Sequence, residues 1–249
     1  MEHLRALWLN LLSVLVVAGC VSRTPVAEGP AAGPMATPYS VSISPADFVG
    51  VVDNLYFPLL PGTRYIYESQ TGEGVERVEV EVLSETREVM GITATIVRDT
   101  VTLDGELIED TFDWFAQDRQ GNVWYLGEDV SNYENGQLAD RAGSWEAGVD
   151  GALPGIIMYA VPSAHIGETY RQEYYPGEAE DMADLMSADE SVTVPYGPFD
   201  DVVQTRDYTP LEPGIEEHKY YAPGIGLIWS EHVGSEEELV LISFMPPGG

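Results

Sequence analysis

The chain has 249 residues, which is enough for one large β domain or two small ones with a substantial core. It carries 42 acidic residues against 11 basic residues, a formal net charge of −31 at pH 7. A surface of this charge repels nucleic acids, so we expect no nucleic-acid partner. The charge is typical of a soluble acidic surface, and a dedicated cation site is the alternative that it leaves open.

The first twenty residues are typical of a targeting signal rather than of a folded domain. An apolar run from Ala6 to Val17 is too short to span a bilayer as a permanent helix. The run leads into the letters LVVAGC at positions 15–20, and this motif resembles a bacterial lipobox. We therefore predict a signal peptide at residues 1–19, directly before Cys20. An ordinary secretory signal with an incidental cysteine is the alternative.

The lipobox resemblance carries expectations about Cys20 and about location. In lipoproteins with this motif, the cysteine is lipidated through its thiol and becomes the mature N-terminus. The resemblance therefore implies an extracytoplasmic protein that meets the membrane through a lipid anchor, such as palmitate, on Cys20. An Asp after that cysteine commonly causes retention at the inner membrane. Val21 stands there instead, which implies the outer membrane if the source has two membranes.

Two further features of the chain follow from Cys20 and the residues after it. Cys20 is the single cysteine, so the mature protein can form no internal disulfide and the body has no thiol nucleophile. Residues 20–44 are rich in Pro, Ala, Gly, Ser and Thr and lack periodicity, which predicts a flexible tether. Residues 45–249 form the predicted β-rich body.

The first half of this body reads as a series of strands. Apolar and polar residues alternate over short segments, with turn residues about every ten positions, which is typical of an antiparallel meander. The predicted strands are Arg64–Gln70, Val75–Leu83, Ile92–Leu103 and, after a turn at Asp104-Gly105, Glu106–Asp118.

The second half of the body repeats the pattern of the first half. Residues 62–128 and 167–232 match at a nearly constant spacing, although any two β-rich halves can align somewhere by chance. We therefore predict a mainly β fold, an antiparallel curved sheet or open barrel built from two duplicated β-meanders, with an insertion at about residues 130–161. Matching positions lie 105 or 106 residues apart: Gly62 and Gly167, Gly91 and Gly197, Ala116 and Ala222, Trp124 and Trp229.

Two motifs of the body resemble those of uncharacterised bacterial secreted proteins and lipoproteins. These proteins open with the pattern PLxxGxxYxY and end with YAxGVGLV. The chain has PLLPGTRYIY at positions 58–67 and YAPGIGLI at positions 221–228. The resemblance covers most of residues 55–232 and implies a curved antiparallel sheet or open barrel, and it brings no catalytic residues.

Few residues of the body are candidates for chemistry. No catalytic motif and no local zinc motif is present, so we expect a protein that is not an enzyme. Aromatic residues of the hairpins would line the concave face of a curved sheet and suit an apolar or glycan ligand, with simple core packing as the alternative. The candidate ligand-binding residues are Trp114, Trp124, Trp145, Tyr220 and Trp229.

Acidic residues gather around one predicted turn. Glu173, Glu178, Glu180 and Asp181 surround the turn at 176–177 and offer the oxygen ligands that calcium prefers, without the spacing of an EF-hand. Calcium is therefore a possible ion, and no other cofactor is indicated.

Three functions remain open at the level of sequence. The first is a membrane-anchored ligand-binding or scaffold module of the cell envelope, which would hold an apolar or glycan ligand or an envelope protein. The second is a calcium-dependent acidic surface module. The third is a hydrolase, which rests only on the abundance of carboxylates.

Overall fold

The computed structural model describes residues 39–248. The predicted signal peptide, the lipidation site at Cys20 and most of the predicted tether lie outside these residues. Strands dominate the described part of the chain, and its two helical elements are 3-10 turns at Pro45–Asp47 and Pro162–Ala164. No helix within residues 39–248 has the length and apolar character needed to cross a membrane.

The first meander consists of five antiparallel strands that pair in sequence order. In β5, Val78 and Val80 are buried while the neighbouring Glu79 and Glu81 are more exposed, as the predicted alternation requires. The β6–β7 turn has left-handed backbone at Asp104 and Gly105, with φ of 49° and 86°, as two-residue hairpins favour. The strands are β4 (Arg64–Gln70), β5 (Val75–Val89), β6 (Ile92–Leu103), β7 (Glu106–Asp118) and β8 (Val123–Glu134).

The second meander repeats this strand order. Its five strands pair in the same succession, β12-β14-β15-β16-β17, as β4-β5-β6-β7-β8 in the first meander. With the spacing of 105 to 106 residues, β6 corresponds to β15 and β7 corresponds to β16 in the sequence. The strands are β12 (Thr169–Arg171), β14 (Met182–Val194), β15 (Gly197–Tyr208), β16 (Glu216–Ala222) and β17 (Gly226–His232).

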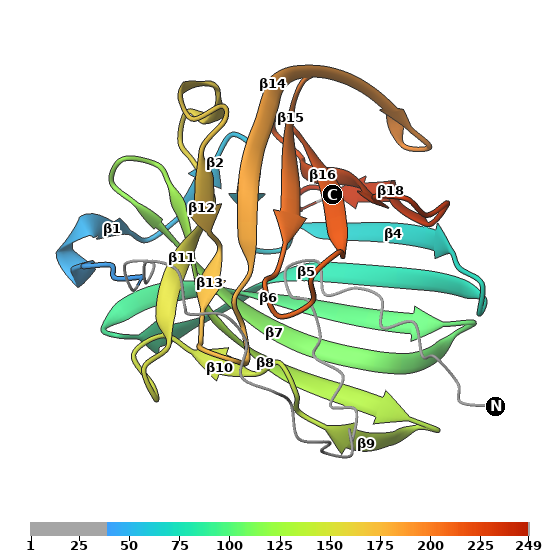
Figure 1. Ribbon diagram of the computed structural model, residues 1–249, viewed down its shortest axis with the longest axis horizontal. Helices are drawn as coiled ribbons and strands as arrows, with labels where there is room; N and C mark the ends of the chain where they lie inside the picture. Colours follow the sequence, from blue (N-terminus) through green and yellow to red (C-terminus); the bar gives the residue numbers. More distant parts are fainter. Residues whose placement is uncertain (1–38, 249) are drawn as a thin grey trace, which may run out of the picture.

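The remaining strands join the two meanders on both sides. On one side β18 (Glu238–Met245) lies between β17 and β4. On the other, β11 (Leu153–Met158) pairs with β8 and with β13 (Glu173–Tyr174). Only Gln172 separates β12 from β13. Because β12 pairs with β14 and β13 pairs with β11, this short segment contacts both edges of the sheet and nearly closes it. The predicted antiparallel, barrel-like fold is confirmed, and Figure 1 shows the first meander (green) crossing the view beneath the upright second meander (orange).

The segment at residues 130–161 is part of the sheet rather than a cover over it. Besides β11 it contains β9 (Gln137–Asp140) and β10 (Trp145–Glu146), and both pair with β8. Gly155 in β11 permits the closure of the barrel, because a Cβ at this position would lie 2.3 Å from the carbonyl carbon of Gln172. Tertiary contact therefore determines the path of this segment, which has no clear period of its own.

A short hairpin lies across one end of the barrel. It is formed by β2 (Val52–Asn54) and β3 (Phe57–Leu59), after β1 (Phe48–Val49), and we call residues 52–59 the capping hairpin. The amide of Asn54 donates to Gln117 Oε1 at 2.8 Å, and the amide of Gly224 donates to the carbonyl of Leu55 at 2.7 Å. These bonds tie the hairpin to β7 of one meander and to the β16–β17 turn of the other.

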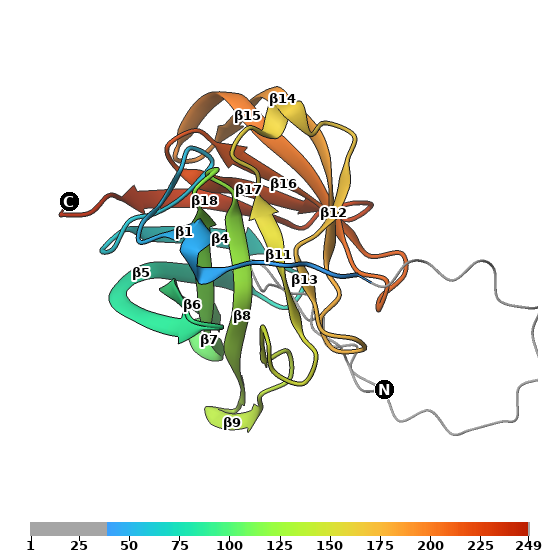
Figure 2. The ribbon, with the colours of Figure 1, turned by 90° about the vertical axis from the view of Figure 1, so that its left-hand side faces the viewer.

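Contacts with the barrel include a residue that precedes the predicted boundary at residue 45. The hydroxyl of Tyr39 donates to the carbonyl oxygen of Pro154 at 2.9 Å, and its ring meets Tyr174 edge to face at 5.4 Å. Tyr39, which belongs to the predicted tether, therefore lies against the barrel surface. Figure 2 shows this end of the described chain (blue) beside β11 and β13.

Candidate ligand-binding site

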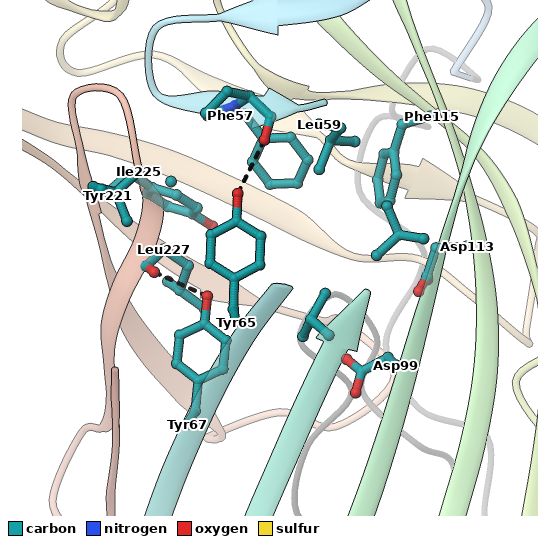
Figure 3. Close-up of a pocket in the computed structure, with 14 residues that line it drawn as sticks. Phe57, Leu59, Tyr65, Tyr67, Asp99, Asp113, Phe115, Tyr221, Ile225 and Leu227 are labelled. Atoms are coloured by element: carbon teal, nitrogen blue, oxygen red, sulfur yellow. Dashed lines mark hydrogen bonds between the residues drawn. The ribbon is translucent and has the colours of Figure 1, made fainter. Parts of the chain in front are cut away.

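A cavity lies beneath the capping hairpin, inside the barrel. Its cavity volume is about 50 Å³, and the whole recess, counting the part open to solvent, contains about 510 Å³ of empty space. Residues from both meanders and from the hairpin line it, as Figure 3 shows. Its aromatic walls are Phe57, Tyr65, Tyr67, Phe115 and Tyr221.

The hydroxyl groups of two tyrosines in the walls donate to backbone carbonyls, one in the capping hairpin and one in β17. The hydroxyl of Tyr65 donates to the carbonyl of Pro58 at 3.1 Å, and that of Tyr67 donates to the carbonyl of Leu227 at 3.0 Å. Phe57 packs edge to face on Phe115 with ring centroids 5.3 Å apart. The walls therefore present mainly ring surface to the cavity, and the Tyr65 hydroxyl bond helps to hold the capping hairpin in place.

Two carboxyl groups form the polar part of the cavity wall. Asp99 on β6 and Asp113 on β7 are each 4% exposed and both line the cavity (Figure 3). The register puts Asp99 opposite Thr111, so Asp113 and Glu109 are its diagonal neighbours on β7. Tyr125 donates its hydroxyl to Asp113 Oδ1 at 2.7 Å. Asp99 Oδ1 is buried and has no hydrogen-bond partner among residues 39–248.

These two residues belong to an interior group of four carboxyls, which we call the acidic group: Glu76, Asp99, Glu109 and Asp113. Burial raises the pKa of Asp113 to about 7 and that of Glu76 to about 7. Burial, with smaller contributions from neighbouring carboxyls, raises the pKa of Glu109 to about 8 and that of Asp99 well above its usual value. Glu76, Glu109 and Asp113 therefore gain and lose protons near neutral pH.

The second meander holds interior carboxyls in a different way. Lys219, the only lysine of the chain, is 5% exposed, and its Nζ lies 3.2 Å from Asp207 Oδ2 and 3.4 Å from Glu217 Oε2. Glu217 Oε1 also lies 2.6 Å from His232 Nε2. Burial lowers the pKa of Lys219, but Asp207 and Glu217 more than offset this effect and raise it. These two carboxyls therefore favour the charged form of Lys219.

The five aromatic residues proposed from the sequence do not line this cavity. Trp114 is buried under the guanidinium of Arg87, whose Cζ lies 3.9 Å from the ring centroid. Tyr220 stacks on Trp229 with centroids 4.3 Å apart. Trp124 donates its Nε1 hydrogen to Asp118 Oδ2, and Trp145 meets Tyr125 edge to face.

The four residues proposed for calcium lie in different environments in the structure. Glu173 and Asp181 are buried, whereas Glu178 is exposed. Glu180 accepts the amide hydrogen of Gly177 and lies 3.5 Å from Arg171. Within residues 39–248, no three carboxylate, histidine or cysteine side chains are arranged to hold a metal ion.

Sequence reasoning missed the residues that line the cavity because of the phase of β7. Asp113 and Phe115 lie on one face of the strand, and Trp114 lies on the other. The usual rule of apolar residues inside favours Trp114 over Asp113. The sequence did contain a usable signal. Asp113 lies two residues from Phe115, so the two share a strand face, and Lys219 and Tyr221 share a face at the matching positions of the second meander.

No protein-family model and no curated protein sequence matches this chain. Among solved structures, it is similar to the crystal structure of a candidate lipoprotein from Parabacteroides distasonis ATCC 8503. The two share 13% sequence identity, the match covers 77% of this chain and 99% of the other, and the TM-score is 0.42. Similarity at this level establishes neither a family nor a shared function.

Proposed function

We propose that the chain is a membrane-anchored extracytoplasmic lipoprotein whose barrel binds a small, mainly apolar ligand in the cavity beneath the capping hairpin. The observation that carries the binding role is the cavity itself, with aromatic walls from both meanders and two carboxyls at one side. The anchor rests on the lipobox at positions 15–20. The role is binding rather than catalysis, and nucleic acids are not expected as partners.

The composition of the cavity supports a ligand that is apolar over most of its surface. Binding sites for small molecules are mostly lined by apolar and aromatic side chains, with a few polar groups that set orientation. The five rings supply the first feature, and Asp99 and Asp113 supply the second. A volume of about 50 Å³ favours a ligand of a few heavy atoms unless the hairpin moves.

Native mass spectrometry of the full chain tests the ligand-binding role. Ile225 is half-buried in the cavity wall, so Ile225→Trp should fill part of the cavity and remove any bound mass. Ile215→Trp is the matched control, because Ile215 is 44% exposed and is not part of the wall. Equal bound mass in the wild type and both variants would contradict binding in this cavity.

The anchor has a separate test in cell fractionation. Replacement of Cys20 by Ser removes the thiol that would carry the acyl chain, so the variant should leave the membrane fraction or remain as an uncleaved precursor. A Cys20→Ser variant that is processed and fractionates like the wild type would show that the lipid anchor is absent.

A further inference from the structure

We propose that the ligand is a small organic cation, an alkylammonium whose charge lies against Asp99 and Asp113 while its apolar part lies against the aromatic walls. The inference rests on the ligand-binding function proposed above and names the chemical class of that ligand. Both carboxyls line the same cavity as the five rings.

The internal repeat shows where a positive charge is needed. The spacing of 106 residues that matches Phe115 with Tyr221 also matches Asp113 with Lys219. In the second meander, Lys219 Nζ lies between Asp207 and Glu217. Within residues 39–248, no lysine, arginine or histidine forms an ion pair with any carboxyl of the acidic group. A ligand ammonium would supply the first meander with the positive charge that Lys219 supplies to the second.

Asp99 provides an independent observation at the same place. It is 4% exposed, it lines the cavity, and its Oδ1 has no hydrogen-bond partner among the described residues. Buried polar atoms without a partner are rare, and such an atom beside a cavity suggests a bound group that supplies one. An ammonium group can donate to Asp99 Oδ1 and lie close to Asp113 at once.

The aromatic walls suit the same ligand. Ring faces carry partial negative charge and attract a cation within about 6 Å of the ring centre. They also exclude water, so the attraction between ammonium and carboxylate is less screened than at the surface. A neutral apolar ligand would gain from the rings but would leave Asp99 Oδ1 without a partner.

Binding of a cation should depend on pH, because the groups that face Asp99 oppose its ionisation. Burial, followed by the neighbouring carboxyls, raises the pKa of Asp99 well above its usual value. Burial also raises the pKa of Asp113, which lines the same cavity, to about 7. A bound ammonium favours the ionised form of both carboxyls, so binding should release protons and strengthen as pH rises through about 7. The titratable groups that interact with Asp99 are Tyr67, Glu76, Glu109, Asp110 and Asp113.

The experiment is calorimetric titration of the full chain carrying Cys20→Ser, so that neither an acyl chain nor detergent competes for the cavity. The probes are n-butylammonium chloride and n-butanol, which have the same shape and differ in charge, with NaCl at equal ionic strength as the blank. We expect n-butylammonium to bind at least about tenfold more tightly than n-butanol, and more tightly at about pH 8 than at about pH 6.

Two single variants locate the charge. Asp99→Asn should weaken n-butylammonium binding by about tenfold or more, because it removes one negative charge from the cavity wall. Asp110→Asn is the matched control, because it also converts one aspartate to asparagine, in this case on β7. Asp110 Oδ1 lies 2.8 Å from Arg98 Nε, and Asp110 does not line the cavity. Thermal melting of each variant verifies that it is folded.

The outcomes separate the two proposals. Equal affinity for n-butanol and n-butylammonium would overturn the cation inference and leave the apolar binding function standing. Binding of n-butylammonium that Asp99→Asn does not change would also overturn the inference. If neither probe binds and native mass spectrometry finds no bound mass, both the inference and the proposed function fail.

Discussion

Position 113 in β7 and position 219 in β16 are equivalent in the two meanders, yet one is Asp and the other is Lys. Lys219 lies beside Asp207 and Glu217, whereas Asp113 adds to the acidic group. Burial raises the pKa of Glu217, but Lys219 and His232 outweigh it and lower the pKa overall. Burial raises the pKa of Asp113 to about 7.

The contrast shows two ways for one barrel to hold buried carboxyls. The second meander places an internal cation, Lys219, beside Asp207 and Glu217, and it depends on that cation for stability. The first meander places no such cation beside its acidic group among residues 39–248, so burial raises the pKa of these carboxyls and the stability of the fold depends on pH. Substitution of Lys219 should therefore destabilise the protein, whereas substitution of Asp113 should stabilise it at high pH.

The largest expected effect comes from Lys219→Met. The substitution leaves Asp207 and Glu217 buried without the lysine, so the free energy of unfolding should fall by about 3–5 kcal/mol at neutral pH. Arg206→Met is the control, because Arg206 is half-exposed where it pairs with Asp184, and its loss should cost less than about 1 kcal/mol. Urea unfolding measures both, and similar losses would show that burial of the lysine is irrelevant.

Asp113→Asn should have the next largest effect, with the opposite sign at high pH. A carboxyl whose pKa is raised in the folded state contributes stability below its unfolded pKa and loses it as pH rises through the folded value. With a pKa of about 7 for Asp113, wild-type stability should fall between about pH 4 and about pH 7. The variant should recover about 2–3 kcal/mol of that loss.

The control for this prediction is Asp110→Asn, which alters the paired carboxyl on the outer face of the same strand. The titratable groups that interact with Asp113 lie on β6, β7 and β8. They are Asp99, Glu109 and Tyr125. Parallel stability–pH curves for the wild type and Asp113→Asn, measured by urea unfolding, would show that this carboxyl does not titrate in the folded protein.

Tyr125→Phe should produce a smaller effect that depends on pH. Its hydroxyl donates to Asp113 Oδ1 at 2.7 Å and lowers the pKa of that carboxyl against the effect of burial. Removal of the donor should cost about 1–2 kcal/mol where Asp113 is ionised and less where it is protonated. Unfolding at about pH 8 and about pH 5 gives the two values, and an equal loss at both would contradict a bond to the ionised form.

The smallest effect is expected from calcium. The net charge of −31 makes the protein repel itself, so the melting temperature should rise as NaCl increases from about 10 mM to about 1 M. In high NaCl, CaCl2 should add nothing, because Glu178 is exposed and Glu180 interacts with Arg171. A melting temperature that still climbs with free calcium would restore the turn at 173–181 as a metal site.

The sequence alone predicted the class of the fold and the succession of strands within the two meanders. Alternating valines in β5, the Asp104-Gly105 turn and the repeat of 105 to 106 residues are local or periodic features, so they can be recognised without a structure. Two comparable meanders and an antiparallel, barrel-like sheet followed from them. The lipobox prediction at Cys20 is likewise a matter of local sequence, and it stays a prediction.

Tertiary structure decided which face of each strand lies inside and where the sheet closes. β7 has Trp114 on one face and Asp113 with Phe115 on the other, and a period of two cannot tell which set faces the cavity. The closure by β11 depends on the close approach of Gly155 to Gln172, which no local pattern encodes. The acidic group is therefore a product of strand pairing, because its four carboxyls come from three strands and meet only when the barrel forms.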